Sequence, residues 1–337
     1  MYKIKVFKSV SILSALVFAA TAMMTCGQGK PAEEEYRKVE GMVWSTTYHI
    51  TYRGPESLAD SVLAEFDKVG RAVNVFDENS LVSQVNRQDS TPVNSDFIRV
   101  YVMSRKVNKL SDGAFDPTLE PLIRAWGFGQ GHKATADTLR IDSLLEAVGI
   151  EKTYLTHDAL VKKDSRIRFN FSAIAKGYGC DRVAEMFRRN GVKDFLVEIG
   201  GEIMAGGKSP SGGKWRVSID KPVLGAAANM EESEAIVEFT DRGLATSGNY
   251  RNYHKENGKI FGHTISAKTG RPVQTDVLSA SVVAATAMEA DALATAFMAM
   301  GSEDSKRLNE QLKLPIMLVL ADSTVYCSPE FDALLSE

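Results

Sequence analysis

Residues that bind zinc or build disulfide frameworks are scarce in this sequence. Only three cysteines and five histidines occur among 337 residues. The histidines form no H-E-x-x-H pair or similar arrangement, which argues against a zinc hydrolase. Besides Cys26 near the N-terminus, Cys180 and Cys327 remain, and a single pair of unknown separation leaves open whether a disulfide joins them.

Three common signatures of catalysis or nucleotide binding are missing as well. There is no G-x-S-x-G stretch, the nucleophile elbow of serine hydrolases. The segment "GFGQG" at 127–131 lacks the G-x-G-x-x-G spacing of a dinucleotide-binding turn. The segment "GGKS" at 206–209 lacks the upstream glycine of a phosphate loop, because Glu202 occupies that position, and we expect a hairpin loop there instead.

An excess of positive charge is also missing, since 40 basic residues face 43 acidic ones and the net charge is −3. This balance argues against a nucleic-acid partner. With 44% apolar and 25% charged residues, the composition is that of a globular protein with one large domain or two smaller ones.

The one long apolar run near the N-terminus, "SILSALVFAATAMM", is shorter than the roughly 20 residues of a membrane-spanning helix. Lys3, Lys5 and Lys8 precede this run, and Cys26 follows it. Such an arrangement is typical of a lipoprotein signal, in which the cysteine becomes the lipidated first residue. The Met-Met-Thr sequence before Cys26 departs from the usual small or leucine residues, so plain secretion is the alternative.

We therefore predict a lipoprotein signal peptide at 1–25, a lipid-anchored polar tether at 26–40 and one catalytic domain at 41–337. The protein is expected in the cell envelope, as a lipid-anchored membrane lipoprotein that faces the periplasm, with the choice between inner and outer membrane open. Removal of residues 1–25 takes away three lysines and no acidic residue, which lowers the net charge from −3 to −6.

Hydrophobic periodicity predicts a mixture of strands and helices. Strands are expected at 46–52, 194–201, 234–240, 259–266, 277–286 and 315–327. Helices are expected at 58–73, from Ser95 or Asp96 as cap to Val107, and at 181–191, 289–301 and 302–312. Strands that come in runs, with only some helices between them, predict an α+β fold of mixed or antiparallel sheets with packed helices.

The expected helix "EADALATAFMAMG" at 289–301 places two polar residues in an apolar run. Asp291 and Thr295 are four residues apart and therefore share one face of the helix. A purely structural explanation is also available. The Thr295 hydroxyl could donate to a backbone carbonyl one turn earlier, and the Asp291 carboxylate could be stabilised by the helix dipole near the start of the helix. The surrounding alanines and large apolar residues instead predict a desolvated carboxylate, for which a hard cation such as Mg²⁺ or Ca²⁺ is a good partner.

Further stretches are too dense in glycine, charge and hydroxyl groups to be explained by packing alone. They are "SDGAFDPTLEPLIRAWGFG" at 111–129, "FNFSAIAKGYGCD" at 169–181, "LATSGNYRNY" at 244–253 with "FGHTISAKTGRPV" at 261–273, and "ADALATA" at 290–296. Together and in this order they resemble the motifs of the FAD:protein FMN transferase (ApbE, flavin transferase) family, once called thiamine-biosynthesis lipoproteins. The resemblance spans about residues 42–301 and implies an ApbE-like, T-fold-like single catalytic body.

The resemblance implies a Mg²⁺-dependent enzyme that splits FAD, attaches the FMN half to a threonine of an exported or membrane redox protein, and releases AMP. Acceptors of the sodium-pumping NADH:quinone oxidoreductase (Nqr) or Rnf type fit this expectation. An FAD pyrophosphatase that yields FMN and AMP, and a non-catalytic flavin-binding lipoprotein, are the alternatives. The metal ligands implied are the side chains of Asp291 and Thr295 and the backbone carbonyl of Gly179 in the "AKGYG" turn.

The resemblance also implies a set of FAD contacts. Lys176 is expected on the phosphates or ribose, and His263 as the general base for the acceptor hydroxyl, with a purely structural hydrogen bond as its alternative. The remaining contacts expected are Ala114, Phe115, Asp116, Ser247, Tyr250 and Thr269, and for Phe115 core packing is an equal alternative.

Three positions depart from the family pattern. Trp44 stands where a methionine is usual, and stacking on the isoalloxazine or adenine ring would replace the methionine contact. Phe76 stands in place of a tyrosine and removes a hydroxyl near the nucleotide, which leaves the balance between transfer and hydrolysis open. Gly179 replaces an alanine, a change that a carbonyl ligand tolerates.

Overall fold

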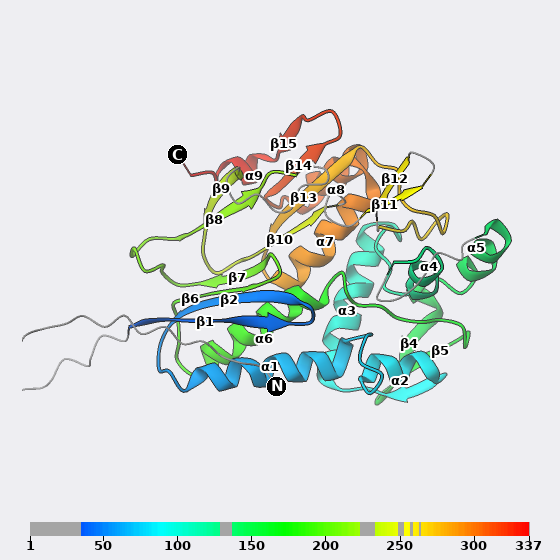
Figure 1. Cartoon of the computed structure of the whole chain (residues 1–337), viewed down its shortest axis with the longest axis horizontal. Coiled ribbons are helices and arrows are strands. Elements are labelled where there is room, and N and C mark those ends of the chain that lie inside the picture. Colours follow the sequence, from blue (N-terminus) through cyan, green and yellow to red (C-terminus); the bar gives the residue numbers. More distant parts are fainter. Residues whose placement is uncertain are drawn as a thin grey trace, which may run out of the picture.

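A computed structural model describes residues 35–128, 137–222, 233–248, 253–256, 259–262 and 264–336. Its centre is an eight-stranded sheet with the order β1-β2-β6-β7-β10-β13-β14-β15, in which every neighbouring pair is antiparallel (Figure 1). The strands are β1 Tyr36–Val43, β2 Thr46–Arg53, β6 Phe195–Ile199, β7 Glu202–Gly206, β10 Gly243–Gly248, β13 Val277–Ala284, β14 Ile316–Leu320 and β15 Val325–Cys327.

Helices cover one face of this sheet, and a two-stranded ribbon covers the other. The longer helices are α1 Leu58–Val73, α3 Ser95–Leu110, α6 Ala175–Arg189, α7 Ala287–Met300 and α8 Ser302–Leu312. Helix α7 packs along β10 and β13, with α6 and α3 against it, and α1 packs on α6 (Figure 1). The ribbon of β8 Trp215–Asp220 and β9 Ser233–Phe239 covers the opposite face with α9 Pro329–Asp332.

Smaller elements complete the described part of the chain. The short helices are α2 Leu81–Arg87, α4 Glu120–Ala125, α5 Thr138–Leu145 and the 3₁₀ turn Ile150–Lys152. A three-stranded sheet has the order β3-β5-β4, formed by β3 Ser90–Pro92, β5 Ala159–Lys162 and β4 Thr153–Leu155. The strands β11 Tyr253–Glu256 and β12 Lys259–Gly262 form a separate hairpin. Among the described residues, no helix combines the length and the apolar character needed to cross a bilayer.

The α+β class predicted from the periodicity is confirmed, because amphipathic segments pack where their apolar faces require. Helix α1 buries its period-3.6 positions, which are Leu58, Val62, Phe66, Val69 and Val73. In β2 the alternate residues Tyr48, Ile50 and Tyr52 are buried, as period-two alternation predicts.

Several expected boundaries were wrong. Strand β1 begins at Tyr36, inside the expected tether, because Tyr36 pairs with Arg53 at the far end of the hairpin. Helix α3 is capped by Asn94, whose side chain accepts from the amide of Phe97 at 2.9 Å, and not by Ser95 or Asp96. The segment 315–327 is two strands, β14 and β15, which pair around a turn at 321–324.

The expectation that the "AKGYG" residues form a turn before a helix was also wrong. These residues form the first turns of α6 itself. Gly177 lies where α6 crosses α7, and a Cβ there would come within 2.3 Å of the carbonyl oxygen of Ala287. This close crossing overrides the low helix propensity of glycine. The expected hairpin at 206–209 is also absent from the described residues, since β7 and β8 belong to different sheets.

The two cysteines in the folded part are free thiols. Cys180 is buried in α6 and donates to the carbonyl oxygen of Glu202 at 3.1 Å. Cys327 lies in β15 and is partly buried.

Candidate functional site

The first turns of α6 and α7 bring the expected metal and phosphate residues together. Asp291 is 3% exposed, and its Oδ2 accepts from the amide of Gly177 at 3.0 Å. The ammonium of Lys176 lies 3.9 Å from Asp291 Oδ1, beyond hydrogen-bonding distance. The desolvation expected for Asp291 from its apolar neighbours is therefore confirmed, and its carboxylate faces the residues of the "AKG" segment.

A second buried carboxylate, Glu202, joins this cluster and was not anticipated as a site residue. Its Oε2 lies 3.0 Å from Lys176 Nζ in an ion pair, and this oxygen has no hydrogen-bond partner among the described residues. Glu202 is the first residue of β7, directly after the paired glycines Gly200 and Gly201, both at positive φ. The signal available in the sequence was an acid directly after two consecutive glycines, which form the two-residue turn between β6 and β7.

One ammonium faces two buried acids in this cluster, so its charges balance only while one of the acids is protonated. Burial raises the pKa of Glu202 to about 8, against the opposing effect of Lys176. Burial likewise raises the pKa of Asp291. Burial alone would lower the pKa of Lys176, but the carboxylates of Asp291 and Glu202 outweigh it and raise that pKa. With both acids ionised the cluster carries an uncompensated negative charge, which is costly in a buried site unless a cation relieves it.

Thr295 lies one helical turn beyond Asp291 and has its own polar partner. The hydroxyl oxygens of Thr295 and of Ser247 in β10 are 3.1 Å apart. Both side chains are only partly buried. The structure thus places two of the expected contact residues side by side, next to the carboxylate of Asp291 on the same face of α7.

Helices α6 and α7 are held in register by direct bonds between them. The carboxylate of Asp181 in α6 accepts from the amides of Ala287 and Met288 at 2.8 and 2.9 Å, and so satisfies the first turn of α7. Burial raises the pKa of Asp181 to about 7, although these two amides act in the opposite direction. With the amide of Gly177 on Asp291, these bonds fix the position of Lys176 relative to α7.

The "GAFD" turn after α3 is a closed hydrogen-bond network. Asp116 Oδ1 accepts from the amide and the hydroxyl of Thr118, and Oδ2 accepts from Asn108 Nδ2 and the amide of Ile150, all within 3.1 Å. Asp116 is 8% exposed, and burial raises its pKa against these donors. Phe115 is buried in the main core cluster, the packing alternative expected for it. Its role and that of the partly buried Ala114 as FAD contacts stay predictions.

The "SAKTG" loop lies against this turn. The ammonium of Lys268 is 2.7 Å from Asp112 Oδ2, and the indole nitrogen of Trp126 donates to the carbonyl oxygen of Gly270 at 2.7 Å. Thr269 is exposed at the tip of this loop. Two motifs separated by about half of the chain are therefore neighbours, and Thr269 stays a predicted phosphate contact.

Comparison with known proteins identifies the family. The model described as "ApbE family" matches residues 44–318. The chain belongs to the ApbE family. It is 33% identical to the FAD:protein FMN transferase of Vibrio cholerae serotype O1 over 338 residues, which cover 96% of this chain and 99% of the relative. It is 32% identical to the FAD:protein FMN transferase of Haemophilus influenzae, with 92% and 93% covered.

Solved ApbE structures have the same fold. The flavin transferase ApbE from Vibrio cholerae superposes with a TM-score of 0.80 at 29% identity, covering 90% of this chain and 100% of that chain. The apo form of the flavinyl transferase ApbE from Pseudomonas stutzeri superposes with a TM-score of 0.82 at 28% identity, covering 90% and 98%. The ApbE-like fold expected from the motifs is confirmed.

Two of the positions that depart from the ApbE pattern, Trp44 and Gly179, lie against one another. Trp44 is in the turn between β1 and β2 and lines a cavity of about 420 Å³. Its ring lies so close to Gly179 that a Cβ on that glycine would be 2.7 Å from a ring carbon. Phe76 is 56% exposed, so its side chain makes no buried contact that replaces a tyrosine hydroxyl.

The carbonyl of Gly179 was expected as a metal ligand, and that role stays a prediction. Gly179 lies in the second turn of α6, where a helical carbonyl normally bonds the amide four residues onward. His263 and Tyr250 lie outside the described residues.

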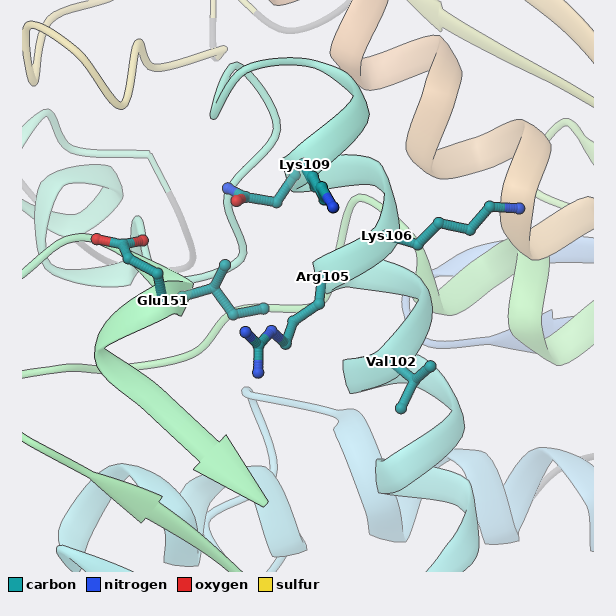
Figure 2. A pocket seen from close by; sticks show the side chains of 7 residues that line it. Val102, Arg105, Lys106, Lys109 and Glu151 are labelled. Atoms are coloured by element: carbon teal, nitrogen blue, oxygen red, sulfur yellow. The ribbon is translucent and has the colours of Figure 1, made fainter. Parts of the chain in front are cut away.

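A second hollow of about 480 Å³ lies on α3, away from these residues (Figure 2). Its lining residues are Val102, Arg105, Lys106, Asn108, Lys109, Ile150 and Glu151. The Lys106 side chain points from α3 toward α7, where its ammonium is 2.5 Å from Glu289 (Figure 2). No residue expected in the ApbE site lines this hollow, and three of its four charged lining residues are basic.

Proposed function

We propose that this protein is an FAD:protein FMN transferase. It binds FAD, cleaves the pyrophosphate, attaches FMN through a phosphoester to a threonine of an exported or membrane redox protein, and releases AMP. The observation that carries the proposal is the buried cluster of Lys176 with two acids, Glu202 and Asp291, beside the hydroxyls of Ser247 and Thr295. The two relatives named FAD:protein FMN transferase match this chain over nearly all of its length, which supports the same activity here.

The donor set fits a Mg²⁺ ion. In the part of the chain that the structure describes, no three His, Cys, Asp or Glu side chains converge on a metal site. Mg²⁺ commonly binds through one or two carboxylates, with substrate phosphates and water filling the other positions. Asp291 and Thr295 would hold it here, and a divalent cation would relieve the repulsion that arises when Asp291 and Glu202 are both ionised. When bound, Mg²⁺ supplies charge neutralisation at the phosphate oxygens.

A backbone oxygen near Asp291 would add to this set. In a regular helix the amide of Gly177 would donate to the carbonyl of Ala173, but it donates to Asp291 instead. The carbonyl of Ala173 is therefore without its helical donor at the start of α6. We propose Ala173, six residues before Gly179, as the source of the backbone ligand.

The chain's own residues support attack on a phosphate. Lys176 carries its positive charge on a flexible stem that is 30% exposed, and the ammonium is suited to bind a diphosphate oxygen. The acceptor hydroxyl oxygen attacks the FMN phosphorus, the bond from that phosphorus to the bridging oxygen breaks, and AMP leaves with this oxygen. His263 is the proposed base that takes the hydroxyl proton.

The same proposal includes the location of the enzyme. The lysine-rich start, the short apolar run and Cys26 support a lipid anchor that holds the folded body at a membrane facing the periplasm. Radiolabelled palmitate incorporated by wild-type protein and not by a Cys26→Ala variant is the expected result. Equal labelling of both proteins would contradict the anchor.

The activity is tested by incubating the purified protein with FAD, Mg²⁺ and an acceptor subunit of Nqr or Rnf type. We expect in-gel flavin fluorescence on the acceptor and an equal amount of AMP, with neither when a chelator is present. An acceptor whose target threonine is replaced by valine is the matched control. Free FMN and AMP without labelled acceptor would instead support the pyrophosphatase, and unchanged FAD would support a storage protein.

A further inference from the structure

The turn between β1 and β2 holds Trp44 in an unfavourable backbone conformation. Val43 pairs with Thr46, so the turn consists of Trp44 and Ser45 alone. Both have positive φ, at 46° and 64°. Turns of this kind usually contain Asn and Gly, because a side chain with a Cβ is disfavoured in the left-handed region. A tryptophan in this position indicates that its ring is needed where the turn places it.

The indole of Trp44 is wedged between two glycines of different helices. Gly70 lies in α1, and a Cβ there would be 3.2 Å from the indole Nε1. Gly179 lies in α6, and a Cβ there would be 2.7 and 2.8 Å from ring carbons Cη2 and Cζ3. Phe66 packs edge-on against the same ring, with centroids 5.7 Å apart and an interplanar angle of 65°. The ring is therefore confined at both ends.

Glycine inside a helix is less favourable than alanine, so two such glycines against one ring require a reason. Gly177, two residues before Gly179, has a different reason, because its missing Cβ makes room for the backbone of Ala287. At Gly70 and Gly179 the nearest atoms belong to the side chain of Trp44. The missing Cβ atoms of both glycines therefore make room for the Trp44 ring and not for the backbone of a crossing helix.

The confined ring lies close to the charged cluster. Lys176 and Gly179 are three residues apart in α6 and so share a face of the helix. The Lys176 stem and Thr46, two residues after Trp44, meet at Gly200, where a Cβ would be 3.2 Å from Lys176 Cδ and 2.8 Å from Thr46 Oγ1. Trp44 is only partly buried and lines the 420 Å³ cavity with Asn74 and Asp77.

We propose that Gly70 and Gly179 are positioning residues that hold the Trp44 indole as a fixed platform for a planar ring of FAD. This inference rests on the proposed function, because it takes FAD, the substrate of that reaction, as the ligand that binds in the cavity. It also connects two departures from the family pattern, because a tryptophan at 44 needs the glycine at 179. An indole held in place stacks on a flat heterocycle without first losing side-chain freedom.

A double-mutant cycle on the full chain tests this coupling. The dissociation constant for FAD is measured by calorimetry with Mg²⁺ and without acceptor, in Trp44 and Trp44→Met backgrounds. Gly179→Ala should weaken FAD binding at least tenfold with Trp44 present, because the added methyl displaces the ring. With methionine at 44 the same change should alter binding less than twofold.

Gly177→Ala is the matched control, because its added methyl meets backbone and should cost the same in both backgrounds. If Gly179→Ala fails to fold beside Trp44, Gly70→Ala supplies the milder displacement at the other end of the ring. Equal losses from Gly179→Ala in both backgrounds, or a lower melting temperature with unchanged FAD affinity, would overturn the positioning role. Absence of FAD binding to the wild-type protein would instead overturn the proposed function itself.

Discussion

Asp116 and Asp291 both belong to motifs that resemble the ApbE family, and both are buried, but their surroundings differ. Asp116 receives hydrogen bonds from four protein donors, two on each carboxylate oxygen. Asp291 receives one from the amide of Gly177, and its other oxygen faces an ammonium at 3.9 Å. Burial raises the pKa of each carboxyl group. The difference between the two therefore lies in the donors, not in the burial.

This difference separates a carboxylate that holds a turn from one that is ready for a ligand. A buried carboxylate whose two oxygens both accept hydrogen bonds is not stabilised further by a cation. A buried carboxylate that lacks a donor on one oxygen and lies beside a second acid is stabilised by a cation. The comparison predicts that removing Asp291 affects catalysis and that removing Asp116 affects stability. Four substitutions test this contrast.

Asp291→Asn has the largest expected effect. Turnover should fall to background, because the amide is a poor replacement for a charged metal ligand, while the free energy of unfolding changes by less than about 1 kcal/mol. The asparagine oxygen still accepts from Gly177, and Lys176 keeps Glu202 as a partner. FMN transfer and denaturant unfolding are the measurements. Normal Mg²⁺-dependent turnover in this variant would show that the metal assignment is wrong.

Thr295→Val should lower turnover by roughly 10²-fold, the scale of losing one electrostatic contact to the reacting group. The shape is kept, so the unfolding free energy should fall only by about 1 kcal/mol for the lost bond to Ser247. Ser247→Ala, assayed at saturating FAD because Ser247 is itself an expected FAD contact, is the matched control, since it removes the same hydrogen bond but leaves the Thr295 oxygen. Similar turnover in the two variants would assign the effect to the bond and not to a ligand oxygen.

Asp116→Asn should act on stability. Its NH₂ group would face donors, so we expect a loss of about 2–3 kcal/mol in the free energy of unfolding, on the scale of hydrogen bonds to a charged acceptor. FAD affinity of the folded protein should change little. Urea titration and calorimetry separate the two quantities. A stable variant that no longer binds FAD would make Asp116 the flavin contact that the family resemblance implies.

Asp276→Asn should have the smallest effect, a modest loss of stability. It serves as the reference for an exposed carboxylate. Asp276 accepts from the amide and hydroxyl of Ser302 at the start of α8. Burial raises the pKa of Asp276, the two Ser302 donors lower it, and the net result is a pKa below the ordinary value of 3.8. The ionised Asp276 carboxylate therefore stabilises the folded protein above pH 3.8, and this stabilisation is lost as the pH falls through the pKa of Asp276 in the folded state.

At pH 7 the Asp276→Asn variant should be about 0.3–1 kcal/mol less stable than wild type, the scale of an exposed negative charge at a helix N-terminus. Thermal unfolding at a series of pH values measures the difference. The two proteins should converge as the solution is acidified below the folded pKa of Asp276. A constant difference at all pH values would show that geometry, and not charge, accounts for the cap.

The sequence predicted those elements whose pattern agrees with their surroundings. The apolar spacing in α1 and the alternation in β2 were sufficient, because each element presents one face to a core. The start of α6 was missed, because Gly177 and Gly179 have low helix propensity and are explained only by neighbours distant in sequence. The role of Glu202 was missed for a related reason, since a single acid has no periodicity to reveal its burial.

The sequence by itself determined the α+β class, the family, and the fact that Asp291 and Thr295 share one helix face. These properties depend on local periodicity and on the order of the motifs. Only the tertiary structure decided which aspartate is satisfied and which is open, because hydrogen-bond donors such as Asn108 and Gly177 come from other elements. It also decided that the indole of Trp44 fits against Gly70 and Gly179. Complementary shape and charge between separate segments exist only after the chain has folded.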